Sequence, residues 1–165
     1  MDLTLWHVGC AIPNSTRDYH YQNMLLSEGQ FAMRKLLALV AVGDDDWKVL
    51  FAKSLMEYGC DVQTFSDGAQ ALEQARRQRY DVVIVDESLP RTGKLEFVLN
   101  LREVAVSTPL VMVTGRLLEK ERDVLSRCQV FFAGTRSQAI SKVGEAVSKA
   151  GSALHGEKEK TAPSR

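Results

Sequence analysis

The sequence predicts one α/β domain in which five strands alternate with five helices, a (βα)₅ arrangement built on a five-stranded parallel sheet. Two features of the 165 residues indicate this. Short apolar runs bounded by polar or turn residues recur along the chain, as is typical of strands buried on both faces. Segments with the apolar spacing of helices separate these runs. Strict alternation with short connections implies that helices cover both faces of the sheet.

Each element follows from its own pattern. The apolar runs predict strands at residues 36–42, 62–65, 82–85, 110–113 and 130–133. The first helix has an apolar stripe of Trp47, Leu50, Phe51 and Leu55, and Gly59 ends it. The later stripes are Ala69, Leu72 and Ala75; Leu95, Val98, Leu99 and Leu101; Leu118, Val124, Leu125 and Cys128; and Ala139, Ile140, Val143 and Val147.

The two ends of the chain differ from this regular part. Residues 1–33 show no sustained helix or strand period, which predicts a poorly structured extension. This extension is either a loosely packed arm or the product of a start codon assigned upstream of a native start at Met33. Residues 151–165 are rich in charge, Gly and Ser and are predicted to be a disordered tail. The predicted domain therefore covers residues 34–150.

Composition excludes several classes of function. Lys and Arg (21) balance Asp and Glu (21), so nothing suggests binding to nucleic acid or to an anionic membrane. No apolar run reaches the roughly 18–20 residues of a membrane span. Three scattered cysteines exclude a structural zinc site and indicate a reducing, cytoplasmic location. All three histidines lie near the chain ends, which excludes a Ser-His or Cys-His hydrolase in the core.

Chemically active side chains follow several of the predicted strands. Three aspartates (44–46) come after the first strand, Asp86 after the third, Thr114 after the fourth and Arg136 after the fifth. The carboxyl ends of parallel strands meet at one edge of the sheet, so these groups are expected to converge. Carboxylate oxygens are ligands for Mg²⁺, and a carboxylate beside that metal can attack a phosphoryl donor. A hydroxyl and a cation would then hold the phosphoryl oxygens.

Residues 80–90 (YDVVIVDESLP) are similar to the third strand and following loop of the receiver domain of bacterial response regulators. Residues 58–62, 65–72 and 108–115 match further motifs of that family in the same order. The resemblance implies a flavodoxin-like fold, a stand-alone regulator that is not an enzyme beyond Mg-dependent self-phosphorylation, and a histidine kinase or phosphotransfer protein as donor. It further implies the following roles: phosphoacceptor, Asp86; Mg²⁺ ligands, Asp44, Asp45, Asp86 and the Ser88 carbonyl; phosphoryl contacts, Thr114 and Arg136. The face expected to contact a downstream protein contains Phe132, Ile140, Val143 and Val147.

The sequence also departs from the family pattern. An ungapped count back from Gly59 places Val42 and Gly43 where the family has two acidic residues, whereas shortening the first helix brings Asp44 and Asp45 into register. The apolar stripe of that helix favours the ungapped count, and Asp44 would then act as a helix cap. Arg136-Ser137 replaces the family's Lys-Pro, and Gly93-Lys94 replaces its Asp-Gly.

Two functions from different classes remain open. The first is a switch controlled by phosphorylation of Asp86. The second is a pseudo-receiver, an interaction module that never binds phosphate. A flavin protein of the same fold is disfavoured, because no phosphate-binding loop follows the first strand.

Overall fold

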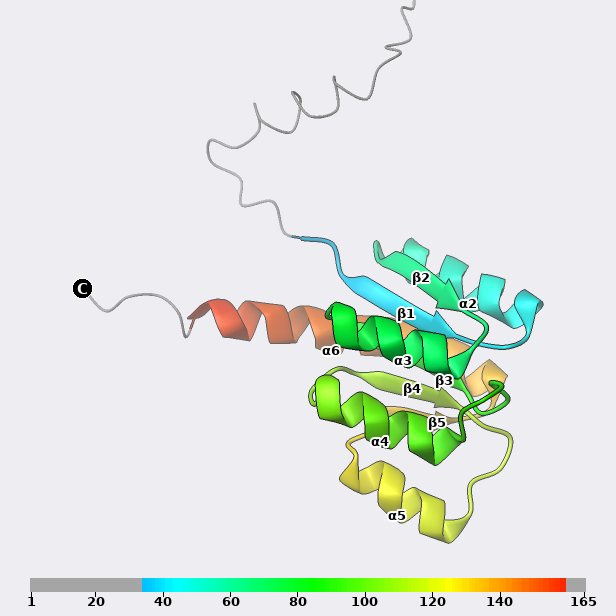
Figure 1. Ribbon diagram of the computed structural model, residues 1–165. Helices are drawn as coiled ribbons and strands as arrows, with labels where there is room; N and C mark the ends of the chain where they lie inside the picture. Colours follow the sequence, from blue (N-terminus) through cyan, green and yellow to red (C-terminus); the bar gives the residue numbers. More distant parts are fainter. Residues whose placement is uncertain (1–33, 160–165) are drawn as a thin grey trace, which may run out of the picture. The chain divides into compact units, whose positions relative to one another are not determined.

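Five parallel strands in the order β2-β1-β3-β4-β5 form one sheet in the computed structural model, which describes residues 34–159 (Figure 1). The strands are β1 (Leu37–Ala41), β2 (Asp61–Phe65), β3 (Val82–Asp86), β4 (Leu110–Val113) and β5 (Phe132–Gly134). The helices are α2 (Asp45–Glu57), α3 (Gly68–Arg77), α4 (Lys94–Val104), α5 (Glu119–Arg127) and α6 (Arg136–Glu159). The flavodoxin-like (βα)₅ prediction is confirmed. The predicted extension at residues 1–33 lies outside the described residues.

Helices cover both faces of the sheet and bury a separate apolar core on each. Helices α2 and α6 pack on one face, where Phe51, Leu55 and Val143 meet side chains of β1, β3 and β4. Helices α3, α4 and α5 pack on the other face, around Phe97 and Leu101 (Figure 1). The strands β1, β3 and β4 are buried on both sides, which explains why they are apolar except for Asp86 at the end of β3.

The strand order determines at which edge of the sheet a functional site is expected. The chain runs from β1 outward to β2 and then returns to add β3 on the other side of β1. This reversal leaves a crevice at the carboxyl ends of β1 and β3, which is where open sheets of this kind bind ligands. Ala41 pairs with Val85 in the register of these two strands, so the next residues, Val42 and Asp86, lie beside each other.

Some predicted elements are displaced. The fifth strand begins at Phe132 and not at residue 130, because Val130 donates its N–H to Leu125 and so completes the end of α5. Leu50 and Leu99 were predicted to lie on buried stripes but are 45% and 51% exposed. In α2 the buried line is Trp47, Phe51 and Leu55, spaced four residues apart, and Leu50 falls to one side of it.

The carboxyl-terminal helix is longer than the sequence predicted. The disordered tail was expected from residue 151, but α6 continues to Glu159. Extending an existing helix adds a hydrogen bond per residue without a new nucleation step, so the glycines at 151 and 156 do not end it. The part of the tail beyond Glu159 lies outside the described residues. Within residues 34–159, no helix combines the length and the apolar character required to cross a membrane.

Candidate functional site

Asp86 lies at the end of the central strand β3, and its side chain is only 3% exposed. The backbone N–H and the hydroxyl of Ser88 both donate to Asp86 Oδ1, each at 2.9 Å. A carboxylate buried to this degree is costly unless both oxygens find partners. Ser88 supplies the partners of one oxygen, and the other oxygen must be satisfied from elsewhere.

Arg136, the first residue of α6, satisfies the second oxygen of Asp86. Its Nε and Nη2 lie 3.2 and 3.0 Å from Asp86 Oδ2. Its Nη1 donates to Asp44 Oδ2 at 3.1 Å, and the guanidinium lies 5.6 Å from the centre of the Trp47 ring. A guanidinium presents several N–H groups in one plane and stacks on aromatic rings, so it can bridge two carboxylates at once. Both oxygens of Asp86 therefore have partners within the protein.

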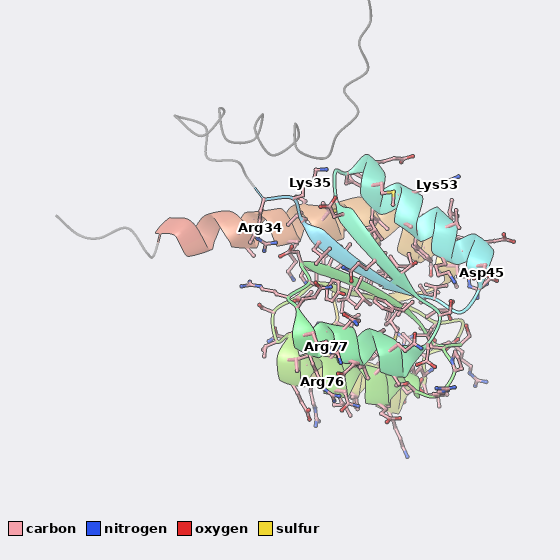
Figure 2. All side chains as sticks on the ribbon, turned by 45° about the horizontal axis from the view of Figure 1, so that its top comes forward. Arg34, Lys35, Asp45, Lys53, Arg76 and Arg77 are labelled. Atoms are coloured by element: carbon pink, nitrogen blue, oxygen red, sulfur yellow. The ribbon has the colours of Figure 1, made fainter. Side chains whose placement is uncertain are left out.

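The three aspartates after β1 have different positions. Asp44 caps α2: its Oδ1 accepts from the N–H groups of Asp46 and Trp47. The hydrogen bond from Trp47, together with the charge of Arg136, holds the pKa of Asp44 below its ordinary value despite some desolvation. Asp45 pairs with Lys48, is 87% exposed and lies on the outer side of the start of α2 (Figure 2). The structure thus brings Asp44 to Asp86 but not Asp45.

The two residues that follow β1 beside Asp86 carry no charge. Val42 is fully buried in the core and is the neighbour of Asp86 in the sheet. A Cβ placed on Gly43 would lie 3.6 Å from the Ser88 carbonyl oxygen, so a side chain at this position would point toward the expected metal position. This register agrees with the ungapped count. By this count the family's two acidic positions are occupied by Val42, which is apolar, and by Gly43, which has no side chain.

Thr114 lies at the end of β4 and is 3% exposed. Its hydroxyl donates to Glu87 Oε2, and the N–H of Gly115 donates to Glu87 Oε1 at 2.7 Å. Thr114 was expected to contact a phosphoryl group, but in this structure its hydroxyl is bound to a carboxylate of the protein. The residues Asp86, Ser88, Thr114, Thr135 and Arg136 still line a common pocket of about 400 Å³.

Lys94 extends this arrangement to two further elements. Its ammonium lies 3.2 Å from Glu87 Oε2, 2.9 Å from Glu121 Oε2 and 3.1 Å from the Arg116 carbonyl oxygen. The side chains of Lys94 and Glu121 are 18% and 15% exposed. Partly buried networks of this kind are less screened by solvent than isolated surface pairs. Lys94 therefore joins the start of α4 to the loop after β4 and to α5.

The electrostatics of Glu87 lead to a pH-dependent stability. Burial alone would raise the pKa of Glu87, but hydrogen bonds from Thr114, Gly115 and Lys94 outweigh it and hold the pKa below its ordinary value of about 4.5. The contribution to folding is therefore fully present above this ordinary value and is lost as the pH falls through the lower folded-state pKa.

We expect Glu87→Gln to reduce the free energy of unfolding at neutral pH by about 1 kcal/mol. The difference from the unmodified chain should shrink as the pH falls below the ordinary value of about 4.5, because the Glu87 carboxylate is then progressively protonated. Urea unfolding across this pH range measures the difference. Glu73→Gln, on an exposed ion pair of α3, is the matched control. A difference that stays constant in acid would contradict the assignment.

The site does not fit a magnesium ion as it stands. Among residues 34–159 there is no cluster of three or more His, Cys, Asp or Glu side chains suited to a metal. Asp86 and Asp44 are the carboxylates closest to the expected arrangement, and the guanidinium of Arg136 bridges them. Mg²⁺ demands near-octahedral oxygen coordination, commonly with carboxylates and several waters. A cation would therefore have to displace Arg136 before it could reach both carboxylates.

The predicted partner face is corrected in part. Val143 is fully buried and Val147 is 8% exposed, and both pack against the sheet from α6. Since they lie in the core, they cannot form the surface that a partner contacts. Phe132 and Ile140 are only partly buried beside the same core. The sequence pattern could not separate these residues, because all four are apolar and three share the helical spacing of α6.

Sequence reasoning missed the roles of Glu87, Lys94 and Glu121. Glu87 stands next to Asp86 in the strongest motif, and Lys94 stands where the family has an acidic-glycine pair. An acid and a base seven residues apart, both close to the predicted site, could have suggested an ion pair. Glu121 gave no such signal, because a glutamate in the first turn of a helix is common.

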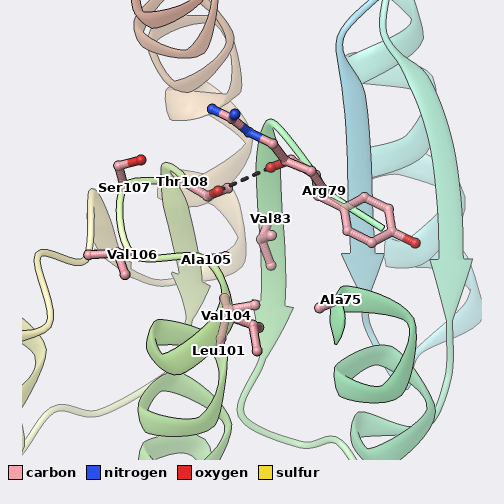
Figure 3. A pocket seen from close by; sticks show the side chains of 10 residues that line it. Ala75, Arg79, Val83, Leu101, Val104, Ala105, Val106, Ser107 and Thr108 are labelled. Atoms are coloured by element: carbon pink, nitrogen blue, oxygen red, sulfur yellow. Dashed lines mark hydrogen bonds between the residues drawn. The ribbon is translucent and has the colours of Figure 1, made fainter. Parts of the chain in front are cut away.

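A second cavity lies at the opposite end of the sheet, near the starts of β3 and β4 (Figure 3). It measures about 280 Å³ and is lined by both apolar and polar residues, among them Val83, Leu101, Arg79 and Thr108. The hydroxyl of Thr108 donates to the Tyr80 carbonyl at 3.0 Å across this region. Its lining includes Arg79 but no carboxylate, so it lacks the groups that gather at the other end of the sheet.

The sheet order and the carboxylate, hydroxyl and cation at its edge define a receiver-type α/β protein. The response regulator receiver domain matches residues 40–131, and the chain belongs to this family. Transcription factor SKN7 of Saccharomyces cerevisiae is 31% identical over 104 residues, covering 61% of this chain and 17% of that protein. The regulatory protein PhoP of Bacillus subtilis is 32% identical over 79 residues, covering 47% of this chain and 33% of that protein. The chain thus spans a third or less of the length of these relatives.

Solved structures show the same fold. Chemotaxis protein CheY4 of Vibrio cholerae superposes with a TM-score of 0.60 at 22% identity, covering 69% of this chain and 99% of that chain. The receiver domain of the sensor histidine kinase PA1611 from Pseudomonas aeruginosa superposes with a TM-score of 0.57 at 20% identity, covering 70% and 99%. A magnesium ion is coordinated in the active-site cleft of the PA1611 domain.

Proposed function

We propose that this receiver domain is an interaction module of a two-component pathway and works without Mg-dependent phosphorylation of Asp86. The observation that carries the proposal is the position of Arg136, whose guanidinium contacts Asp86 and Asp44 together. Its positive charge lies between the carboxylates that would face a metal. The domain thereby neutralises Asp86 with a group of its own.

The loss of the neighbouring acid supports the same conclusion. With Val42 and Gly43 directly after β1, two positions beside the expected metal position carry no carboxylate. Fewer anionic ligands weaken the attraction for a divalent cation and leave Arg136 as the main counter-charge of Asp86. Without the metal, no divalent cation neutralises the charge on an incoming phosphoryl donor, and the attack of the Asp86 carboxylate on it is suppressed.

In this proposal the output is a protein contact and not a reaction. The general partner of a receiver domain is a histidine kinase or phosphotransfer protein, and a downstream protein would be the second partner. The even balance of 21 basic and 21 acidic residues gives no basis for binding nucleic acid. Phe132 and Ile140 are the part of the predicted partner face that remains accessible to such a contact.

Phosphorylation of Asp86 is the second candidate, and the shared pocket favours it. Asp86, the Ser88 backbone, Thr114 and Arg136 line this pocket together. In this alternative Arg136 would turn away from Asp86 to contact the phosphoryl group, and Asp44 with the Ser88 carbonyl would join Asp86 around Mg²⁺. Asp45 would require a rearrangement of the start of α2, since it is exposed and paired with Lys48.

Tryptophan fluorescence separates the two candidates. The full chain with Trp6→Phe retains Trp47 as its single tryptophan, and the guanidinium of Arg136 lies over that ring. We expect no saturable change when Mg²⁺ and then beryllofluoride, a mimic of the phosphoryl group, are added. We also expect no mass increase after incubation with acetyl phosphate and Mg²⁺.

The control is Asp86→Asn in the same background. A saturable, Mg-dependent response that disappears in Asp86→Asn would overturn the proposed function and establish the phosphoacceptor alternative. A response that persists in Asp86→Asn would arise outside this site and would leave the proposal standing. A circular dichroism spectrum of each variant confirms that both are folded.

A further inference from the structure

The carboxylate of Glu87 has an unusual set of donors for a residue in a turn. It receives the hydroxyl of Thr114, the backbone N–H of Gly115 and the ammonium of Lys94. A hydroxyl, an amide N–H and a cation that converge on one point are the donor types that bind a phosphoryl or sulfate group. Here the anion that these donors surround is the Glu87 side chain of the protein itself.

We propose that Glu87 is a built-in anion that takes the place of an acquired phosphoryl group at Thr114, Gly115 and Lys94 and permanently fixes the loop after β4. The inference deepens the proposed function, on which it rests for the premise that Asp86 is not phosphorylated. It concerns how the domain is regulated: the charge of Glu87 holds the loop after β4 and helix α5 in one arrangement, with no need for a phosphoryl group.

The contacts of Glu87 and Lys94 join the ends of β3 and β4 to the starts of α4 and α5. Glu87 follows β3, Thr114 and Gly115 follow β4, and Lys94 begins α4. Lys94 continues to Glu121, whose Oε2 also accepts the N–H of Leu118 at 3.0 Å, just before α5. A single chain of contacts therefore runs from the residue next to Asp86 to the first turn of α5.

Packing around α5 makes this chain of contacts important. Leu125 is the one buried residue of α5, so apolar packing of this helix is sparse. The segment from Gly115 to Lys120 is largely exposed. Segments with few buried apolar contacts open locally at low cost. The polar network is consequently a main restraint on the position of α5.

Arg136 and Glu87 divide the roles that a metal and a phosphoryl group would have. Arg136 places a cation between Asp86 and Asp44, and Glu87 places an anion against Thr114 and Gly115. Glu87 and Asp86 do not compete for donors, because Arg136 and Ser88 serve Asp86 whereas Thr114, Gly115 and Lys94 serve Glu87. Both carboxylates therefore have a cationic partner within the protein without any ligand.

Amide hydrogen exchange on the full chain, without metal or phosphoryl donor, tests the inference. In Glu87→Ala we expect the amides from Gly115 through α5 to exchange about tenfold faster than in the unmodified chain. Glu87→Gln should give an intermediate rate, since its amide oxygen can still accept a hydrogen bond but cannot pair with the charge of Lys94. Glu73→Ala, which removes an exposed glutamate on α3, should leave these rates unchanged.

Rescue by inorganic phosphate separates an anion site from a merely structural bridge. Phosphate added to Glu87→Ala should slow exchange at Gly115 and in α5, and should have no effect on the unmodified chain or on Glu87→Ala combined with Lys94→Gln. Unchanged exchange in Glu87→Ala would overturn the inference, and so would faster exchange that phosphate does not slow. The proposed function has a separate test at Trp47 with Mg²⁺ and beryllofluoride, so failure of one is distinguishable from failure of the other.

Discussion

Combining Gly43→Asp with Arg136→Lys is expected to create a magnesium site and to raise the affinity for Mg²⁺ at least about 100-fold above that of the unmodified chain. A Cβ at position 43 would have ordinary van der Waals separation from Ser88, at 3.6 Å from its carbonyl oxygen, so the new carboxylate would have room. It would lie near Asp86 on the adjacent strand. Lysine keeps the positive charge but lacks the fork that bridges Asp86 and Asp44.

The fluorescence of Trp47 in the Trp6→Phe background measures this gain, because the backbone N–H of Trp47 donates to Asp44 and the ring therefore lies close to the new metal position. Gly43→Asn with Arg136→Lys is the matched control, since it has the same shape at position 43 without the charge. Magnesium binding of equal strength in the Asn variant would show that the missing acid is not what limits the site. A folded Asp variant that binds no Mg²⁺ would show that the loop after β1 does not reach the metal position.

Each single variant has a distinct expected result. Arg136→Lys alone frees Asp44 and Asp86 from their bridge but restores no ligand, so its affinity for Mg²⁺ should rise only slightly. Gly43→Asp alone adds a carboxylate that Arg136 can also bind. Its affinity for Mg²⁺ should therefore lie between those of Arg136→Lys and the double variant. If Arg136→Lys alone accounts for the whole increase, the guanidinium is the sole barrier to the metal and the absence of the acid at position 43 is secondary.

The arrangement of the strands could be predicted from the sequence because the pattern that defines it is repeated. Buried parallel strands require continuous apolar runs, and the runs around Val83 and Val111 have no other plausible role. The position of Asp86 at the end of β3 followed directly, since the run ends with this residue. The ungapped register also followed, because the buried line of Trp47, Phe51 and Leu55 sets the rotation of α2.

The state of the site could not be predicted in the same way. Arg136 was expected near a phosphoryl group on account of its position after β5, but its contact with Asp44 depends on the length of its side chain and on the Trp47 ring beneath it. The partners of Thr114 depend on the rotamer of Glu87. Such contacts join residues far apart in the chain, and no local pattern records them. The expected tail beyond residue 151 failed for a different reason: composition does not show where an established helix stops.

Loss of the Arg102 guanidinium is expected to have the largest effect on stability among the substitutions considered. Arg102, in the last turn of α4, donates to the carbonyl oxygens of Ala105, Thr108, Cys128 and Gln129 at 2.6 to 3.1 Å. These carbonyls belong to the loop between α4 and β4 and to the turn between α5 and β5. Burial lowers the pKa of Arg102, so the charge is partly desolvated and is compensated by backbone dipoles.

Arg102→Met keeps much of the apolar stem of the side chain but leaves these four carbonyl oxygens without their donor. We expect the free energy of unfolding to fall by about 2–4 kcal/mol, because partly buried acceptors that lose their donor are costly. Arg102→Lys should lose about half as much, since one ammonium can reach only part of the set. Urea unfolding measures both variants, with Arg76→Met, on the exposed face of α3, as the control.

The Arg102 substitution also separates the two ends of the sheet. Arg102 lies at the amino-terminal ends of β4 and β5, whereas Asp86, Arg136 and Glu87 lie at the carboxyl-terminal ends. Distant substitutions without shared partners usually have additive effects on stability. Arg102→Met combined with Glu87→Gln should therefore destabilise the domain by the sum of the two single effects. Glu121 restrains the start of α5, and the carbonyls of Cys128 and Gln129 restrain its end. A strongly non-additive result would mean that α5 moves as one rigid body and so couples these two restraints.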